Sequence, residues 1–327
     1  MDEKIKVLAV TGPTASGKSS LAILLAKALD GEIVSLDSMQ IYRGMDIGTA
    51  KASASERAEV AHHLIDILDP TESFSAADYA CRAEAVIEDI AARGKTPILC
   101  GGTGLYLEAL RTARHGSVMP NDLAFREEMR ALAEKEGREA VHALLAQIDA
   151  ESAEAIHPNN LTRVIRALEI YRVTGKPKSA FDREASTENP RISILNLTLT
   201  FRTRELLYSR IDERVDQMID EGLFEETKAL YESGRLKEGT TAAAAIGYKE
   251  CAGAVRGEMT VDEAKETLKL ATHHYAKRQV TWFSAKEHIP VYMDEDGAMR
   301  QREDILKELL THAEDFLNDK SKTKREK

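Results

Sequence analysis

Hydrophobic positions in the first 110 residues alternate between short continuous runs and stripes at helical spacing. The runs at residues 7–10, 33–36 and 97–100 have the length and composition of buried strands. Residues 19–29 and 75–93 instead repeat their apolar side chains every three or four positions, which predicts helices. Strands that alternate with helices are typical of a parallel sheet covered on both faces.

The pattern changes near Pro120. Only helical periodicity follows as far as residue 175, and residues 176–190 are polar and irregular before a β-type run returns at 192–200. The remainder is largely helical, with a short late strand at 288–294. We therefore predict two domains, an α/β core at residues 1–120 and 191–327 and an all-helical insertion at residues 121–190.

Two of the late helices have clear apolar faces, which predicts that each packs on the core along one side. The first face contains Leu207, Ile211, Val215 and Met218. The second contains Val261, Ala264, Leu268, Ala271 and Tyr275.

A glycine-rich segment, GPTASGKS, connects the first predicted strand to the first predicted helix. It fits the pattern of the phosphate-binding loop, in the strand–loop–helix context that this motif requires. Loop N–H groups and the helix N-terminus capture an anion, Lys18 adds a positive charge, and Ser19 supplies a hydroxyl for a divalent cation. We predict a P-loop NTPase-like core whose phosphate or diphosphate site is Gly12, Pro13, Thr14, Ala15, Ser16, Gly17, Lys18 and Ser19.

Asp37 stands at the carboxyl end of the second predicted strand, where ligands bind in open α/β sheets. One interpretation makes it a helix cap or an outer ligand of magnesium. The other makes it a base that accepts a proton from a nucleophile approaching the bound diphosphate. The third predicted strand ends in Gly101 and Gly102 rather than in the acidic residue with which a hydrolytic NTPase holds magnesium. These features suit a transferase as well as a kinase.

Composition sets the class of protein. The 327 residues are 43% hydrophobic and 31% charged, which is typical of a soluble globular protein. No apolar stretch reaches the ~18 residues of a membrane span, and the charged N-terminus leads straight into the first strand, so we expect no membrane segment or signal peptide. Cys81, Cys100 and Cys251 lack paired or metal-ligand spacing and are expected to be reduced, buried thiols of a cytoplasmic protein.

The net charge of −10 argues against a protein coated in nucleic acid, but the charge is unevenly distributed. Residues 163–178 hold five basic groups and a single acid, Glu169. This helix is therefore either a contact surface for RNA or an ordinary solvated face. The tail at residues 321–327 is also basic, and we expect it to be a disordered end.

Further motifs follow the glycine loop in a fixed order. They are DSMQIYRGMDIGTAK, FSAADY, GGTGLY, HPNN with RVIRALEIYR, IGYKE and YAKRQVTWF. Together with GPTASGKS, they closely resemble the bacterial tRNA dimethylallyltransferases, also called isopentenyl-diphosphate:tRNA transferases. The resemblance runs from about residue 7 to residue 285, and DSMQIYRGMDIGTAK is its most specific motif.

The resemblance implies a reaction and its partners. Such enzymes move the dimethylallyl group from dimethylallyl diphosphate to N6 of adenosine 37, beside the anticodon of certain tRNAs, and release diphosphate. They need Mg²⁺, and the bacterial reaction consumes no ATP. We expect a monomer that acts on the tRNA anticodon stem-loop. Two alternatives stay open from the residues alone: a small-molecule or nucleoside kinase that uses ATP at the same loop, and a non-catalytic RNA-binding module.

The matching segments also imply residue roles. Lys18 would neutralise charge on the leaving diphosphate, Asp37 would take or orient the N6 proton, and Thr103 would contact the base. Arg214 would join the glycine loop in binding the diphosphate, and Ser19 would bind Mg²⁺. The tRNA contacts implied in the same way are Asp37, Ser38, Met39, Gln40, Thr103, Arg126, Thr162, Arg163, Val164, Ile165, Arg166, Ile246, Gly247, Tyr248 and Lys249.

Two positions depart from the family pattern. Family members commonly have Gln at the position of Ala244 and Arg at the position of His273. Ala244 cannot form a hydrogen bond through its side chain, and a histidine is largely neutral at pH 7. These two departures therefore weaken the inference of an RNA or diphosphate contact at Ala244 and His273.

Overall fold

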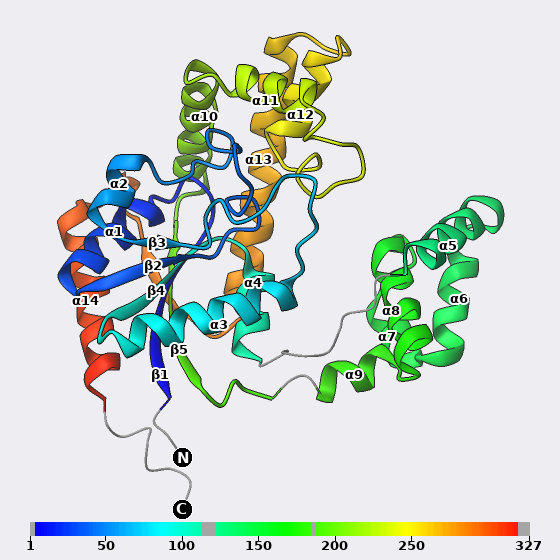
Figure 1. Ribbon diagram of the computed structural model, residues 1–327, viewed down its shortest axis with the longest axis horizontal. Helices are drawn as coiled ribbons and strands as arrows, with labels where there is room; N and C mark the ends of the chain where they lie inside the picture. Colours follow the sequence, from blue (N-terminus) through cyan, green and yellow to red (C-terminus); the bar gives the residue numbers. More distant parts are fainter. Residues whose placement is uncertain (1–3, 113–121, 185–186, 320–327) are drawn as a thin grey trace, which may run out of the picture. The chain divides into compact units, whose positions relative to one another are not determined.

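The computed structural model describes residues 4–112, 122–184 and 187–319. The chain forms two compact units (Figure 1). Unit 1 joins Met1–Arg111 to Pro190–Lys327, and unit 2 is Thr112–Asn189. Each unit has a hydrophobic core of its own, as expected of separately folded bodies.

Unit 1 is built on a six-stranded sheet in the order β3-β2-β4-β1-β5-β6, with every pairing parallel. The strands are β1 (Ile5–Thr11), β2 (Gly31–Ser35), β3 (His62–His63), β4 (Thr96–Gly101), β5 (Ile192–Thr200) and β6 (Ile289–Tyr292). This sheet confirms the predicted α/β class. The sequence pattern missed β3, because two residues at the edge of a sheet are too few to show alternation.

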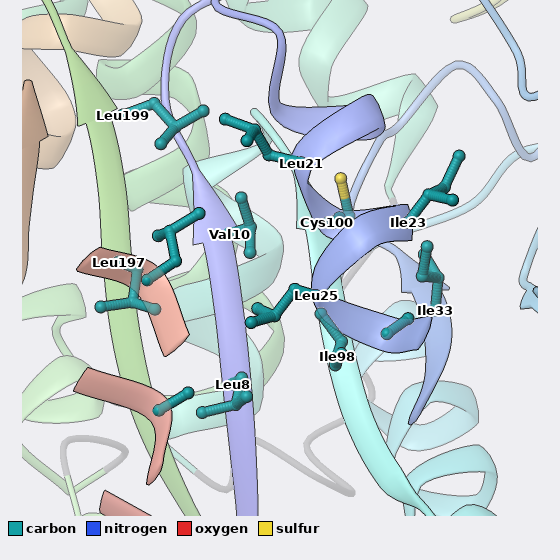
Figure 2. Close-up of a cluster of buried hydrophobic side chains, with 14 of the residues drawn as sticks. Leu8, Val10, Leu21, Ile23, Leu25, Ile33, Ile98, Cys100, Leu197 and Leu199 are labelled. Atoms are coloured by element: carbon teal, nitrogen blue, oxygen red, sulfur yellow. The ribbon is translucent and has the colours of Figure 1, made fainter. Parts of the chain in front are cut away.

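Helices cover both faces of this sheet. They are α1 (Lys18–Ala28) and α14 (Arg302–Asn318) on one face, and α3 (Ala76–Ala92) and α4 (Gly104–Arg111) on the other. Figure 2 shows Leu21 and Leu25 of α1 lying against β1 beside Val10. Each such buried leucine stabilises the fold by ~2 kcal/mol. The loop between β1 and α1 is therefore held at both ends by packed elements.

The remaining elements of unit 1 lie late in the chain, apart from α2. They are α2 (Ala54–Glu59), α10 (Arg204–Asp220), α11 (Leu223–Glu232), α12 (Tyr248–Val255), α13 (Val261–Ser284), β7 (Asp294–Glu295) and β8 (Ala298–Met299). Leu207 and Ile211 of α10 form a cluster with Ala276 of α13 and Ala15 of the loop after β1. Two helices distant in sequence are thus packed beside the glycine loop. The buried face predicted for α10 is confirmed for Leu207, Ile211 and Val215.

The buried face of α13 differs from the predicted one. Val261 is 39% exposed, and the buried side chains are Ala264, Leu268, Thr272, Ala276, Gln279 and Phe283. Two polar residues therefore stand on the inner face of this helix. Thr272 Oγ1 donates to Leu268 O of the same helix, whereas Gln279 bonds to other elements. An apolar stripe could not reveal either residue, since polar side chains do not contribute to it.

Unit 2 contains helices only in its described part. They are α5 (Leu123–Glu136), α6 (Arg138–Ile148), α7 (Ala150–Ala155), α8 (Leu161–Thr174) and α9 (Lys178–Glu184). The three predicted apolar stripes meet in one core that includes Met129, Leu145 and Val164. The expectation that residues 176–190 are irregular is wrong at α9. Asp149 Oδ2 accepts the Ser179 N–H at 2.9 Å, a tertiary contact that local sequence does not reveal.

The structure bears differently on the predictions for the thiols, for a membrane segment and for the basic tail. Cys81, Cys100 and Cys251 are free, but Cys81 is exposed, so the expectation of burial is wrong there. Its neighbours Ala80 and Ala83 form the buried side of α3 and leave Cys81 on the outer side. No helix in the described part of the chain is long and apolar enough to cross a bilayer. The basic tail at residues 321–327 lies outside that part.

Candidate active site

The glycine loop, residues 12–19, leaves β1 through a conformation that only glycine adopts easily. Gly12 has φ 134° and Gly17 has φ 82°. A Cβ on Gly12 would lie 2.4 Å from Leu199 O, so β5 also leaves no space for a side chain. α1 begins directly after Gly17, and no side chain caps it. The N–H groups of its first turn are therefore open to an anion.

Two cations beside the glycine loop have few partners. Lys18 Nζ donates to Pro13 O at 3.1 Å. Burial, opposed by Cys100 and Asp37 and reinforced by Arg214, lowers the pKa of Lys18 to about 8. Burial also lowers the pKa of Arg214 on α10, whose Nε has no hydrogen-bond partner among the described residues. Desolvated cations with few partners are costly, so the surroundings of Lys18 and Arg214 are suited to an anion.

Asp37 follows β2 and interacts electrostatically with both Lys18 and Arg214. Its Oδ1 accepts the backbone N–H groups of Met39 at 2.8 Å and Gln40 at 3.3 Å, which fixes the orientation of the carboxylate. In the part of the chain that the structure describes, nothing donates to Oδ2. The charge of Asp37 raises the pKa values of Lys18 and Arg214 against the effect of burial. Asp37 is thus a fixed carboxylate with one free oxygen beside the anion site.

Thr103 lies next to Asp37 because the turns after β2 and β4 are bonded to each other. Thr103 N donates to Leu36 O at 3.1 Å, and Ser38 N donates to Thr103 Oγ1 at 3.0 Å. Gly101 permits this approach, since a Cβ there would lie 2.2 Å from Leu36 O. The structure therefore brings together Lys18, Asp37, Thr103 and Arg214, which the sequence analysis placed in one site.

Arg210 is a site residue that the sequence analysis missed. Its Nε donates to Ala15 O at 2.9 Å, inside the glycine loop. It also lines a pocket of about 220 Å³ beside Ser16, together with Arg300 and Arg302. Ser16 Oγ is buried, and no described residue bonds to it. The available signal was spacing, because Arg210 stands one helical turn before Arg214 and on the same side of α10.

A carboxylate on α11 holds the loop that follows Asp37. Glu226 accepts the consecutive backbone N–H groups of Asp46, Ile47 and Gly48 at 3.0–3.3 Å. It also accepts the Tyr248 hydroxyl at 2.5 Å. A Cβ on Gly48 would lie 2.6 Å from the Tyr248 ring. The segment after Asp37 and the segment at residues 246–249 are therefore fixed against each other, through a glutamate that carries no sequence motif.

These bonds determine which predicted tRNA contacts have free side chains. Gln40 is occupied internally: its Oε1 accepts from Ser35 Oγ at 2.9 Å, and its Nε2 donates to Thr49 O at 3.2 Å. Tyr248 is fully buried, with burial and the charge of Glu226 raising the pKa of its hydroxyl. Lys249, by contrast, is exposed. The surface at residues 246–249 is therefore presented by Lys249 rather than by Tyr248.

Comparison with known proteins identifies the family. The family model described as IPP transferase matches residues 40–286. The chain belongs to this family. A tRNA dimethylallyltransferase of Caldanaerobacter subterraneus subsp. tengcongensis is 45% identical over 89% of this chain and 93% of its own. A tRNA dimethylallyltransferase of Geobacillus thermodenitrificans is 49% identical over 88% of this chain and 89% of its own.

Solved structures of the IPP transferase family agree with the fold. The tRNA isopentenylpyrophosphate transferase from Bacillus halodurans has a TM-score of 0.68 and 42% identity, and covers 96% of this chain and 97% of its own. A eukaryotic dimethylallyltransferase acting on tRNA has a TM-score of 0.80 and 29% identity, and the match covers 96% of this chain and 80% of that protein's chain. The family resemblance is therefore confirmed, and the kinase alternative is not favoured, because the relatives are named for prenyl transfer.

Unit 2 holds the other tRNA contacts that the IPP transferase resemblance implies. Glu169 of α8 is fully buried and forms ion pairs with Arg126 of α5 at 3.0 Å and with Arg166 at 2.5 Å. Val164 and Ile165 are buried in the core of this unit. Thr162 and Arg163 are the exposed side chains of the run at 162–166. Arg126 and Arg166 are thus engaged by a buried acid, whereas Arg163 faces solvent.

The buried Glu169 is expected to stabilise unit 2 through its two arginines. Burial opposes its charge, but hydrogen bonds from Arg126 and Arg166 outweigh this effect and lower its pKa. Glu169→Gln is expected to reduce the free energy of unfolding by ~2 kcal/mol in urea titrations followed by circular dichroism. The difference in the free energy of unfolding between the wild type and Glu169→Gln should reach its maximum at neutral pH. It should disappear in acid, below the lowered pKa of the wild-type carboxyl.

Glu127→Gln is the matched control for this substitution. The Glu127 side chain is 70% exposed and pairs with Arg130 on the same helix. It is expected to change the free energy of unfolding by less than ~0.5 kcal/mol. Equal effects of the two substitutions would contradict a stabilising role for the buried carboxylate.

His273 and Ala244, the two departures from the family pattern, occupy different surroundings. The His273 ring stacks on Tyr208 of α10 at a centroid distance of 4.3 Å. Its Nε2 lies 2.9 Å from Asp212 Oδ1. His273 is therefore engaged between α10 and α13, while Ala244 is exposed.

Proposed function

We propose that this protein transfers the dimethylallyl group from dimethylallyl diphosphate to N6 of adenosine 37 of tRNA and releases diphosphate. One observation carries the proposal: Lys18 and Arg214, two desolvated cations, stand with an uncapped helix N-terminus at one end of a site that has Asp37 at the other. An anionic leaving group and a proton-bearing nucleophile fit these two ends. The family's named activity supports the same assignment.

The transfer is a substitution at the first carbon of the dimethylallyl group. The adenine N6 forms a bond to this carbon as the bond from the carbon to the diphosphate oxygen breaks, and the diphosphate leaves with the electron pair. Lys18, Arg214 and the loop N–H groups stabilise the charge that develops on the diphosphate. Asp37 accepts the N6 proton through Oδ2, while Oδ1 stays bonded to Met39 N. Thr103 contacts the base beside it.

A magnesium ion fits this arrangement with Ser19 as its protein ligand. The described residues contain no group of three or more His, Cys, Asp or Glu side chains that could hold a metal by themselves. Mg²⁺ commonly binds through one or two protein oxygens together with phosphate oxygens and water, so a sparse donor set is compatible with it. When bound, Mg²⁺ would supply further neutralisation of the diphosphate. The exposed Ser19 stands in the first turn of α1, next to Lys18.

The acceptor must leave its stack to reach Asp37. Extruding a base costs a few kcal/mol, part of which stacking and edge contacts in a pocket return. In unit 1, Ser38 and Lys249 are the candidates to contact the displaced loop, since Gln40 and Tyr248 are engaged internally. The free thiols are compatible with action in the cytoplasm.

Labelled substrate tests the proposed function directly. The protein is incubated with labelled dimethylallyl diphosphate, Mg²⁺ and an unmodified tRNA that carries adenines at positions 36 to 38, without ATP. We expect label in the RNA and one diphosphate released per group transferred. An RNA that stays unlabelled while diphosphate is released would mean hydrolysis, and would contradict the proposal.

Arg163 is expected to contact the phosphate backbone of the tRNA. Arg163→Ala should weaken tRNA binding and lower the slope of log affinity against log salt by about 1, because one phosphate contact is lost. Filter binding at several salt concentrations measures this slope. Arg138→Ala, which removes another exposed arginine of unit 2, is the control and should leave the slope unchanged. An unchanged slope for Arg163→Ala would count against a backbone contact.

A further inference from the structure

Gln279 on α13 bonds to two separate turns of the active site with one side chain. Its Oε1 accepts the backbone N–H of Thr14 at 2.9 Å, and its Nε2 donates to Gly102 O at 3.0 Å. The residue is 6% exposed. The partners fix the orientation of the amide, because an N–H group can only donate and a carbonyl oxygen can only accept.

The two bonded groups belong to opposite ends of the proposed reaction. Thr14 lies in the glycine loop, which binds the diphosphate in the proposed function. Gly102 directly precedes Thr103, whose Oγ1 accepts from Ser38 N next to Asp37. A single planar amide therefore spans from the leaving-group side to the side of the acceptor base. Among the described residues, Gln279 is the only side chain that forms hydrogen bonds to both of these turns.

The packing around Gln279 leaves little freedom in the distance between the glycine loop and the Thr103 turn. A Cβ on Gly102 would lie 2.1 Å from Gln279 Nε2 and 3.3 Å from Gly12 O. The glycine turn is thus pressed against both the amide and the glycine loop. The Tyr275 hydroxyl, which burial keeps neutral by raising its pKa, interacts with Thr103 and Gln279. α13 therefore sets the distance between the two turns from one side.

We propose that Gln279 is a positioning residue that holds the glycine loop and the Thr103 turn at the separation that prenyl transfer requires. This inference rests on the proposed function and deepens it. Gln279 touches backbone groups of both turns and need not touch either substrate. Its loss should therefore affect the rate of the bound complex more than the binding of the substrates, since small errors in alignment are costly.

Gln279→Glu tests the two hydrogen bonds of Gln279 separately, because it preserves one and disrupts the other. The variant keeps the oxygen that accepts from Thr14 but turns a carboxylate oxygen toward Gly102 O. We expect kcat to fall about 100-fold at pH 8, with KM for tRNA within about threefold of the wild type. A buried carboxyl has a raised pKa, and its protonated form can donate to Gly102 O. The ratio of variant to wild-type kcat should therefore rise as the pH is lowered to 6.

Gln279→Leu is the second variant, and it has no group that can titrate. Its kcat should be at least as low, with a ratio to the wild type that does not change with pH. Thr281→Glu, which adds a carboxylate at an exposed position of the same helix, is the control and should keep the wild-type kcat. Thermal unfolding identifies a variant that fails to fold, in which case the kcat and KM of the other variant decide.

The outcomes separate this inference from the proposed function. A wild-type protein that does not label tRNA contradicts the proposed function. An active wild type with an unchanged kcat in either Gln279 variant, or with a Gln279→Glu ratio that does not depend on pH, overturns the positioning role. A loss confined to KM would also overturn it.

Discussion

Asp37→Asn is expected to slow prenyl transfer about 1,000-fold, because it removes the base that accepts the N6 proton. The substitution preserves the shape of the side chain and leaves an Oδ1 that can accept from Met39 N and Gln40 N. The only atom that changes is Oδ2, which is replaced by an amide nitrogen that cannot accept the N6 proton. The measurement is the single-turnover rate at saturating tRNA, alongside tRNA binding by filter assay.

The affinity for tRNA should be little affected by Asp37→Asn. Asp37→Ala, which also breaks the bonds to Met39 and Gln40, should slow transfer far more than it weakens tRNA binding. Asp315→Asn on α14 is the control, since it removes an exposed carboxylate and should leave the rate unchanged. Equal losses of rate and of tRNA affinity would mean that Asp37 is structural rather than catalytic.

Lys18→Met is expected to reduce kcat/KM for dimethylallyl diphosphate by at least about 100-fold, because the charge on the leaving diphosphate loses its principal counter-charge. Lys27→Met is the matched control. It changes a lysine of the same helix whose side chain is 47% exposed and which pairs with Glu59. That control should retain the wild-type kcat/KM. A small loss in Lys18→Met, close to that of Lys27→Met, would exclude Lys18 from the leaving-group site.

The pH dependence of the wild type follows from the lowered pKa of Lys18. Burial brings this pKa to about 8. Only the protonated amine attracts the diphosphate, so kcat/KM for dimethylallyl diphosphate should be full below this pKa and fall as the pH rises through it. Lys18→Met lacks the titrating group and should show no fall in this range. A wild-type profile that stays flat above pH 8 would contradict the assignment.

The sequence was most informative where local pattern and chemistry coincide. The apolar runs around residues 7–10 and 33–36 predicted strands, and the parallel sheet confirms this class. The glycine loop is defined by its own residues, so its geometry follows from Gly12 and Gly17. The proximity of Asp37 and Thr103 was implied by family resemblance, and the structure explains it through the bond from Thr103 N to Leu36 O.

The residues that the sequence did not reveal act through tertiary contacts. Gln279 is a polar position on the buried face of α13, where an apolar stripe carries no signal for it. Glu226 stands on an ordinary amphipathic helix, and nothing in that segment indicates that it binds three backbone N–H groups of a distant loop. The family resemblance implied a tRNA contact for Arg166, but nothing in the local sequence indicated that this side chain pairs with the buried Glu169.

Replacement of one base in the tRNA tests whether N6 of adenosine 37 is the acceptor of the dimethylallyl group. Two anticodon stem-loop RNAs, one with adenosine and one with guanosine at position 37, are incubated with labelled dimethylallyl diphosphate and Mg²⁺, then digested to nucleosides. We predict label only in the RNA with adenosine 37, recovered as the N6-dimethylallyl nucleoside, and loss of this product in Asp37→Asn. Equal labelling of the two RNAs, or product formation by Asp37→Asn at the wild-type rate, would contradict it.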